Sequence, residues 1–315
     1  MHNPILMWLL FIGIVIALLA IDLGVLHKEN REIGVKESLY ISLGYICVGL
    51  LFGAWIWFDQ GAQKGAEYLT GFAIEKSLAL DNIFVISLIF TYFAIPRKYQ
   101  YRILFWGIVG VIVLRALMIG IGAAMVAKFA WLLYIFAVFL IFTGIKMLFI
   151  VDNLPDIKSN PLIRFIRRHV NVTNEIHEHH FFVKIKEAGK NGDGTWYITP
   201  LFLALILIEC MDLIFAVDSV PAIFAITTDT YIVYTSNIFA ILGLRALYFA
   251  LDALLVRFKY LKYALAILLV FIGSKIFIAE LMGLAKFPPM IALAITFGIL
   301  ASGVIYSLYK TRKSS

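Results

Sequence analysis

Residues 75–82 read Glu75-Lys76-Ser77-Leu78-Ala79-Leu80-Asp81-Asn82, and they interrupt an apolar segment long enough to cross a lipid bilayer. A second apolar segment contains Asp212-Leu213-Ile214-Phe215-Ala216-Val217-Asp218-Ser219, with the same spacing of six residues between its two carboxylates. A carboxylate in hydrocarbon costs about 3 kcal/mol on insertion scales. Because the chain places four carboxylates there, we expect them to hold a proton, an ion or a buried basic partner.

The composition predicts a membrane protein made of helices. The chain has 315 residues, of which 62% are hydrophobic, whereas soluble domains contain about half. Nine apolar runs of about 20 residues predict an all-α, polytopic fold with about nine spans. They lie near 5–26, 38–58, 70–93, 102–126, 129–150, 198–226, 232–252, 262–282 and 288–309. The first run lacks a basic leader and a small-residue cleavage site, so we expect a permanent helix.

The basic residues predict the orientation of the chain. Of the 27 Lys and Arg residues, nineteen lie in connections on one predicted side of the membrane, three on the other side and five inside helices. By the positive-inside rule the N-terminus is outside and the C-terminus is cytoplasmic, which an odd number of spans satisfies. The net charge of +7 is thereby explained without a nucleic-acid partner.

The two acidic motifs belong to a predicted internal repeat within one transmembrane domain, residues 1–315. Repeat A covers about 70–150 and repeat B about 198–282. Leu114-Arg115-Ala116-Leu117 matches Leu244-Arg245-Ala246-Leu247, and Phe142-Thr143-Gly144-Ile145-Lys146 matches Phe271-Ile272-Gly273-Ser274-Lys275. Units of three helices enter the membrane from opposite sides, so the copies are expected to be inverted. Secondary transporters with inverted repeats bind ions near the midplane, between the repeats.

The loop at about 151–197 is polar, basic and predicted to be cytoplasmic. It contains a helical candidate at 161–169 and a turn at 191–194, and it is the expected docking site for any partner protein. Its tract Glu175-Ile176-His177-Glu178-His179-His180 is a candidate metal site, although His-rich tracts are a weak signal. The tract does not match the helical zinc-protease pattern, because His180 follows Glu178 too closely.

Eleven charged residues are predicted inside the helices. The bases are Lys76, Arg115, Lys146, Arg245 and Lys275, and the acids are Asp22, Glu75, Asp81, Glu209, Asp212 and Asp218. One interpretation is that ion pairs fix the helix packing, with Arg115 and Arg245 holding acids of the motif helices through their planar forks. Lys146 has the alternative of snorkelling to the interface.

The motif acids also predict a metal site. Asp81 lies beside Asn82, and Asp218 beside Ser219, so each repeat offers a carboxylate next to a neutral oxygen. With Glu75 and Asp212 these hard oxygen ligands suit Mg²⁺, Ca²⁺ or Mn²⁺ rather than Zn²⁺ or Cu⁺. Six residues rotate about 240° around a helix. The two acids of a motif therefore face different neighbours, or the helix breaks between them, and Pro221 favours local irregularity.

No sequence pattern predicts an enzyme. The chain shows no nucleophile motif, phosphate-binding glycine loop or haem signature. Cys47 and Cys210 both fall in apolar runs, where they are expected to act as small apolar side chains.

At these residues the chain resembles the TerC family of integral membrane proteins, most closely its Alx-like bacterial members. The resemblance covers nearly the whole chain. It rests on 75–85, on 199–205 with Glu209, Asp212 and 215–222, on 237–248, and on Asp22-Leu23 with Lys36-Glu37-Ser38-Leu39. It implies membership of the wider LysE-like transporter group, Mn²⁺ efflux, a response to alkaline pH and tellurite resistance. The acidic positions it carries over are Glu75, Asp81, Asp212, Asp218 and Asp22.

Together with this resemblance, which supplies the identity of the metal, the residues predict a bacterial inner-membrane exporter of Mn²⁺ that works by alternating access and H⁺ antiport. Mn²⁺ is the transported ion, and no permanently bound cofactor is expected. Asp81 and Asp218 are the expected principal ligands, with Glu75, Asp212, Asn82 and Ser219. Supporting or proton-coupling roles are expected for Asp22, Glu209, Arg115, Arg245, Lys76, Lys146 and Lys275. The alternatives are a carrier of Ca²⁺, an amino acid or an oxyanion, and a non-transporting scaffold that metalates or inserts partner proteins.

Overall fold

The computed structural model describes residues 4–24, 34–129, 131–149, 161–185, 195–251, 260–284 and 287–312. Its first helices are α1 (Pro4–Gly24), α2 (Val35–Gln60), α3 (Ala62–Tyr92), α4 (Arg97–Lys128) and α5 (Leu132–Phe149). A short helix α6 (Pro161–His169) and a hairpin of β1 (Phe182–Ile185) and β2 (Thr195–Ile198) follow. The remaining helices are α7 (Pro200–Phe224), α8 (Thr230–Ile241), α9 (Leu244–Leu251), α10 (Leu261–Leu281) and α11 (Pro289–Arg312).

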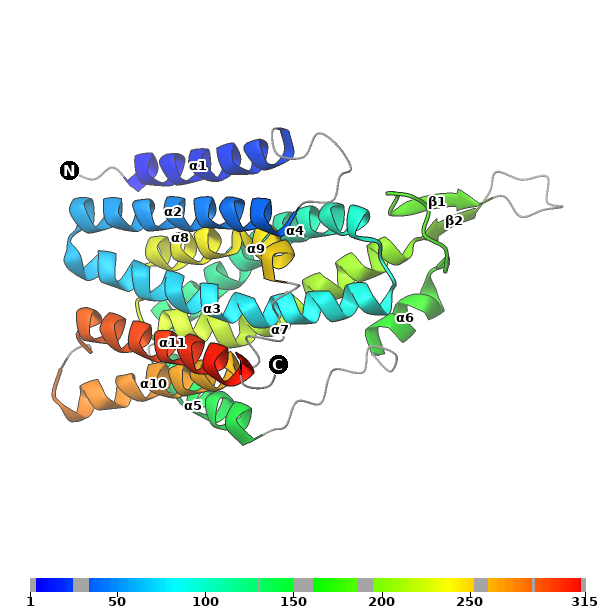
Figure 1. Ribbon diagram of the computed structural model, residues 1–315. Coiled ribbons are helices and arrows are strands. Elements are labelled where there is room, and N and C mark those ends of the chain that lie inside the picture. Colours follow the sequence, from blue (N-terminus) through cyan, green and yellow to red (C-terminus); the bar gives the residue numbers. More distant parts are fainter. Residues whose placement is uncertain are drawn as a thin grey trace.

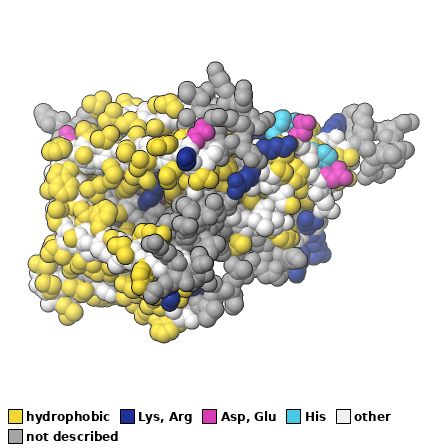
Figure 2. All heavy atoms as spheres, in the orientation of Figure 1, with side chains coloured by type: hydrophobic (Ala, Val, Ile, Leu, Met, Phe, Trp, Pro, Cys, Tyr) yellow, Lys and Arg dark blue, Asp and Glu magenta, His cyan; other side chains and the backbone are white. Residues whose placement is uncertain are grey.

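The prediction of an all-α, polytopic membrane protein is confirmed. Among the described residues, eight helical segments are long and apolar enough to cross a membrane, with α8 and most of α9 counted as one. They coincide with eight of the nine predicted runs. The other predicted run lies in α3, which has 31 residues and differs from the eight segments in its charged residues, Lys64, Glu67, Glu75, Lys76 and Asp81. Exposed apolar side chains cover much of the helical bundle at the left of Figure 2. Many of the basic side chains gather at the right of the same view.

The helices lie side by side around α3, which packs against α2, α7, α8 and α11. Figure 1 shows α1 at one edge of the bundle, and α5 with α10 at the opposite edge. The start of α1 and the end of α11 point to opposite ends of the bundle, and α6 and the hairpin project beyond the end towards which α11 runs. This central place of α3 brings its polar side chains into contact with polar groups of α4, α7 and α8.

The segment between α5 and α7 has more structure than its sequence predicts. The predicted helix at 161–169 is confirmed as α6. The hairpin of β1 and β2 is not predicted by the sequence; its antiparallel register pairs Phe182 with Ile198 and Ile185 with Thr195. Short strands of this kind give little signal in a basic, mixed-polarity loop. The predicted turn at 191–194 lies outside the described residues.

The helix that is interrupted is not the one that contains Pro221, where the sequence predicts irregularity. The α7 helix continues through Pro221 to Phe224, and α3 is unbroken from Glu75 to Asp81. Pro221 lies in the last turn of α7, so the backbone bond that it cannot donate is one of the last in the helix. The predicted helix at 232–252 is instead broken after Ile241, and at Gly243 an added Cβ would lie 2.8 Å from Cβ of Tyr45.

Helices α5 and α10 approach each other through two matching glycines. An added Cβ at Gly144 would lie 2.6 Å from the carbonyl oxygen of Ala266, and one at Gly273 would lie 2.5 Å from that of Ala137. The next neighbours, Val270 and Ile141, are equally reciprocal. Residues before the glycine on one helix meet residues before the glycine on the other, so the helices are antiparallel. A two-fold relation between the predicted repeats would produce this contact, although the repeat itself stays a prediction.

We expect Gly144→Ala and Gly273→Ala to destabilise the protein by similar amounts, about 1–3 kcal/mol each, because the new methyl group meets backbone that cannot give way. The measurement is the apparent melting temperature in detergent. Gly120→Ala in α4 is the control, because nothing lies within 4 Å of its added Cβ, and alanine there gains up to about 1 kcal/mol of helix propensity. Unchanged melting temperatures for both variants would contradict the close approach.

Candidate functional site

The guanidinium of Arg115, on α4, lies at the centre of a buried polar cluster. Its Nη1 donates to Glu75 Oε1 at 2.6 Å, to Ser219 Oγ at 2.7 Å and to Asn237 Oδ1 at 3.1 Å. Its Nε and Nη2 donate to the two carboxylate oxygens of Asp212, at 3.1 and 3.0 Å. This two-point contact is the geometry in which arginine binds carboxylates most strongly. Arg115 thus joins α4 to α3, α7 and α8.

Two amides complete the cluster. The Nδ2 of Asn237 donates to Glu75 Oε2 at 3.0 Å, and the Nδ2 of Asn82 donates to Asp212 Oδ1 at 3.1 Å. The Oδ1 of Asn82 is buried and has no hydrogen-bond partner among the described residues. A buried amide oxygen without a partner is unusual in a folded protein. It is one acceptor that the cluster leaves available to a cation.

Four of the six predicted metal ligands are brought together here. Glu75, Asn82, Asp212 and Ser219 come from the motif segments of α3 and α7, and all of them lie around Arg115 or one of its partners. Asp81 and Asp218 also belong to α3 and α7, but their side chains lie outside the described part of the structure.

The cluster is closed to solvent and carries an excess of acid. Arg115, Glu75 and Asp212 are 1%, 3% and 7% exposed. With both acids ionised, two negative charges face one positive charge, so the formal net charge of the three is −1. Electrostatic interactions are stronger in such a low-dielectric site than in water. The arrangement therefore suits a further positive charge, such as a metal ion or a proton.

A small cavity adjoins the cluster. It has a volume of about 30 Å³, and Asn82 and Asp212 are the only polar residues in a lining that otherwise consists of apolar residues and Gly107. A cavity needs roughly 10–15 Å³ to hold one water molecule, so this one accommodates a water or two and no hydrated ion. Within the described residues the cluster is therefore buried beside a cavity of this small size.

A second buried ion pair joins Asp22 of α1 to Arg245 of α9. Both residues are less than 5% exposed. The guanidinium of Arg245 also lies over the ring of Tyr101, with 4.1 Å to the ring centroid, and the hydroxyl of Tyr101 donates to the backbone oxygen of Asp22 at 3.3 Å. Arg245 therefore holds an acid of the first helix, unlike Arg115, which holds acids of the two motif helices.

Glu209 lies three residues before Asp212 on α7 and packs against Gly110 of α4. Its carboxylate leaves no room for a Cβ at Gly110, whereas a Cβ at Gly107, one turn earlier, would have only ordinary contacts. Both carboxylate oxygens are enclosed and have no hydrogen-bond partner within the described residues. Glu209 is therefore a half-buried residue with an enclosed carboxylate, which receives no hydrogen bond from Arg115 and lies one turn from Asp212.

The remaining predicted bases have separate places. The ammonium of Lys76 donates to the backbone oxygen of Ala240 at 3.0 Å, near the C-terminal end of α8, where the helix dipole favours a cation. Lys275 is buried in α10, and Lys146 is exposed on α5. Lys76 thus links α3 to the end of the broken helix, and Lys146 does not belong to the cluster.

Asn237 is a member of the cluster that the sequence analysis does not single out. It is fully buried on α8 and binds both Glu75 and Arg115. Its signal in the sequence is an amide in the apolar run that also carries Arg245. An amide in such a run is costly unless it finds a partner. The break after α8, which interrupts the helix four residues after Asn237, has no such signal besides Gly243.

Comparison with known proteins gives one family. The model of the integral membrane protein TerC family matches residues 60–315. A membrane protein of Rickettsia bellii is 50% identical over 303 residues, which cover 96% of this chain and 97% of that protein. A protein of Escherichia coli named "Putative membrane-bound redox modulator Alx" is 44% identical over 313 residues, covering 96% of this chain and 94% of the relative. No solved structure matches the chain.

Proposed function

We propose that this chain, which belongs to the TerC family of integral membrane proteins, exports Mn²⁺ across the bacterial inner membrane in exchange for protons. It is a multi-pass membrane protein, and the proposal makes it a carrier and not an enzyme, with no permanently bound cofactor. In the proposed orientation the N-terminus is outside and the C-terminus is cytoplasmic. The segment with α6 and the hairpin then faces the cytoplasm, where a partner protein could dock.

The observation that carries the proposal is the buried cluster of oxygen ligands around Arg115. Glu75, Asp212, Asn82 and Ser219 supply carboxylate, amide and hydroxyl oxygens from α3 and α7. Divalent Mn²⁺, Mg²⁺ and Ca²⁺ favour ligands of this kind. The sequence adds Asp81 and Asp218 from the same two segments. Buried acids in excess of their basic partners are typical of ion and proton pathways in membrane proteins.

The position of Arg115 suggests how the ion is exchanged. In the proposed cycle a cation that enters the cluster competes with the guanidinium for Glu75 and Asp212, so that Arg115 releases at least one of them. Protons then take the place of the metal ion on the acids when it leaves on the outer side. The break between α8 and α9, with Lys76 bound to the backbone of Ala240, gives α8 a discontinuity of the kind found in secondary transporters. We propose that this break allows the exchange between inward and outward states.

The charges favour a cation over an anionic substrate. Arg115 is bound to two carboxylates, Arg245 is paired with Asp22, and Lys76 donates to a carbonyl oxygen. An amino acid or oxyanion at the cluster would have to displace a carboxylate from Arg115, whose three guanidinium nitrogens all donate hydrogen bonds. Ca²⁺ remains a competitor for the same oxygen ligands, so competition by Ca²⁺ and Mg²⁺ is part of the test below.

The name of the Escherichia coli relative includes the term "redox modulator". Cys47 of α2 and Cys210 of α7 are the two cysteines of this chain, and both are free thiols on different helices. The structure therefore contains no disulfide between these two cysteines. We therefore prefer transport as the primary function, with any effect on redox state following from the metal that is moved.

We expect the purified protein to carry Mn²⁺ into proteoliposomes in a saturable way, and faster with a pH gradient that drives exchange. Asp81→Asn and Asp218→Asn are each expected to lower this flux by about tenfold or more, because losing even an outer partner of a metal ligand costs 10–100-fold. The measurement is the initial rate of Mn²⁺ uptake, with Ca²⁺ and Mg²⁺ as competitors.

Glu280→Gln is the matched control, because it also removes one carboxylate from a membrane helix, but an exposed one in the last turn of α10. Its flux is expected to equal that of the native protein. Normal Mn²⁺ flux in Asp81→Asn and Asp218→Asn would contradict the assignment of these two residues to the metal site. Folded native protein that moves no Mn²⁺ would instead favour the scaffold function or another substrate.

A further inference from the structure

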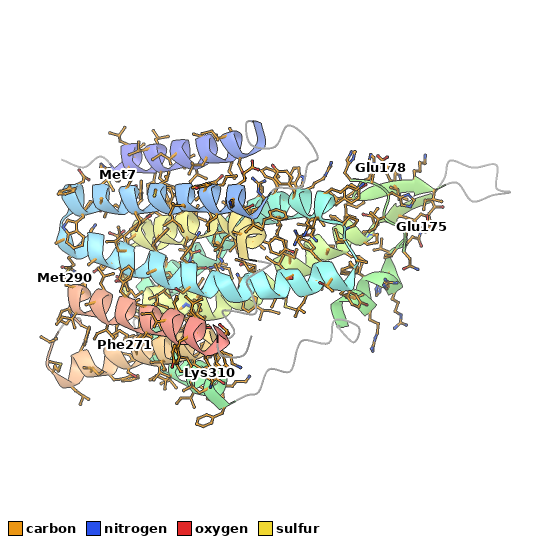
Figure 3. The ribbon with its side chains drawn as sticks, viewed as in Figure 1. Met7, Glu175, Glu178, Phe271, Met290 and Lys310 are labelled. Atoms are coloured by element: carbon orange, nitrogen blue, oxygen red, sulfur yellow. The ribbon has the colours of Figure 1, made fainter. Side chains whose placement is uncertain are left out.

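A separate group of metal-binding side chains lies outside the membrane bundle, between α6 and β1. Glu178, His179 and His180 each offer one ligand atom, and these atoms all lie within 4.8 Å of one another. Figure 3 shows Glu175 and Glu178 on the part of the molecule that projects beyond the helices. In the space-filling view, histidine and acidic side chains lie close together on this part (Figure 2). It is the side that the charge distribution predicts to be cytoplasmic.

The backbone explains how three consecutive side chains meet at one point. Consecutive side chains of an extended chain point to opposite faces. Here Glu178 has φ +45°, a left-handed conformation that is uncommon for residues other than glycine. The N–H of His180 donates to the carbonyl oxygen of His177 at 3.0 Å and closes the turn. The rings of His179 and His180 stack with centroids 4.3 Å apart.

The chemistry of this group differs from that of the membrane cluster. Two imidazoles and one carboxylate form the ligand set with which proteins bind Zn²⁺ while leaving a coordination position open. Imidazole nitrogen favours Zn²⁺, Ni²⁺ and Cu²⁺ over the hard cations Mg²⁺ and Ca²⁺. Ligands at 2.0–2.1 Å from a tetrahedral ion lie about 3.4 Å from each other. Small side-chain rotations therefore suffice to close the group around an ion.

The turn is also tied to the start of α7. The hydroxyl of Thr199, the residue before α7, donates to the carbonyl oxygens of His180 at 2.8 Å and Phe181 at 3.1 Å. The N–H of Thr199 donates to the carbonyl oxygen of Phe181 at 3.0 Å. The ring of Phe182 packs on Phe202 in the first turn of α7, with 4.5 Å between centroids. An ion bound at the turn would therefore fix the N-terminal end of α7, the helix that carries Asp212.

We propose that Glu178, His179 and His180 form a binding site for a divalent transition-metal ion of the Zn²⁺ type. The site is distinct from the oxygen cluster around Arg115. Its occupancy fixes the turn, and through Thr199 it stabilises the start of α7. Metal binding at this site requires no transport activity, so its test is independent of the test of the proposed export function.

The test is Zn²⁺ binding to the full-length protein, purified in detergent without a polyhistidine tag and measured by equilibrium dialysis at micromolar Zn²⁺. The native protein is expected to bind one Zn²⁺ more than the double variant His179→Ala/His180→Ala, and Glu178→Gln is expected to weaken binding by at least about tenfold. Zn²⁺ should raise the apparent melting temperature of the native protein and leave that of the double variant unchanged.

Matched controls come from the same part of the chain. Glu175→Gln and His169→Ala remove an exposed acid and an exposed histidine outside the group, and both should bind Zn²⁺ as the native protein does. Asp81→Asn/Asp218→Asn should also keep the site, which separates it from transport. Equal Zn²⁺ binding by the native protein and by the folded double variant would overturn the proposal, as would a native protein that binds no Zn²⁺.

Discussion

Arg115→Gln is expected to destabilise the folded protein by about 3–5 kcal/mol, because it leaves two buried carboxylates without their counter-charge. Arg115 makes contacts with Glu75 and Asp212 in a place where neither acid reaches water. Removing one partner of a buried ion pair costs more than the pair contributes, since the remaining charge stays desolvated. The measurement is the apparent melting temperature in detergent, together with the yield of monodisperse protein.

The double variant Arg115→Gln/Asp212→Asn tests the cause of this loss. It restores the formal net charge of the group to −1, so we expect it to recover more than half of the lost stability. Lys146→Gln is the matched control, because it removes a basic residue from a membrane helix at an exposed position, where substitutions usually stay within about 0.5 kcal/mol. A double variant no more stable than Arg115→Gln would mean that hydrogen-bond geometry, and not charge balance, holds the cluster.

Arg245→Gln is expected to have the second large effect, about 3 kcal/mol, because it removes the positive charge beside Asp22. The pair joins α1 to α9, so its loss should loosen the first helix from the bundle. Asp22→Asn/Arg245→Gln removes both charges, and we expect its melting temperature to lie near that of the native protein. Limited proteolysis after α1 would report the loosening directly.

Tyr101→Phe separates the ion pair from its surroundings. The variant keeps the ring under Arg245 and removes only the hydroxyl that donates to the backbone of Asp22, so a cost of about 1 kcal/mol is expected. If Tyr101→Phe were as harmful as Arg245→Gln, the hydroxyl bond and not the ion pair would be the main contact. A native-like Arg245→Gln would show that Asp22 finds other compensation within the fold.

Much of the architecture follows from the sequence alone. The apolar runs identify the described membrane helices to within a few residues at most ends, because a span needs about 20 apolar residues whatever its neighbours are. Only α3 begins well before its predicted run, at Ala62 instead of residue 70, because its first turns are polar and pack on α2. The sequence does not reveal the hairpin, nor the break between α8 and α9. The hairpin consists of two four-residue strands, and the break coincides with the close approach of Gly243 to Tyr45, which is distant in sequence.

The features of the candidate site also fall into two groups, those that the sequence determines and those that depend on the tertiary structure. The sequence by itself determined that this protein lies in a membrane and keeps acidic and basic side chains there, because hydrophobic length and the cost of buried charge are local properties. Only the tertiary structure decided which charges meet. Arg115 selects Glu75 and Asp212, Arg245 selects Asp22, and Asn237 joins the first of these groups. These partners lie at least 40 residues apart in sequence, so they are set by how the helices pack, which no local pattern records.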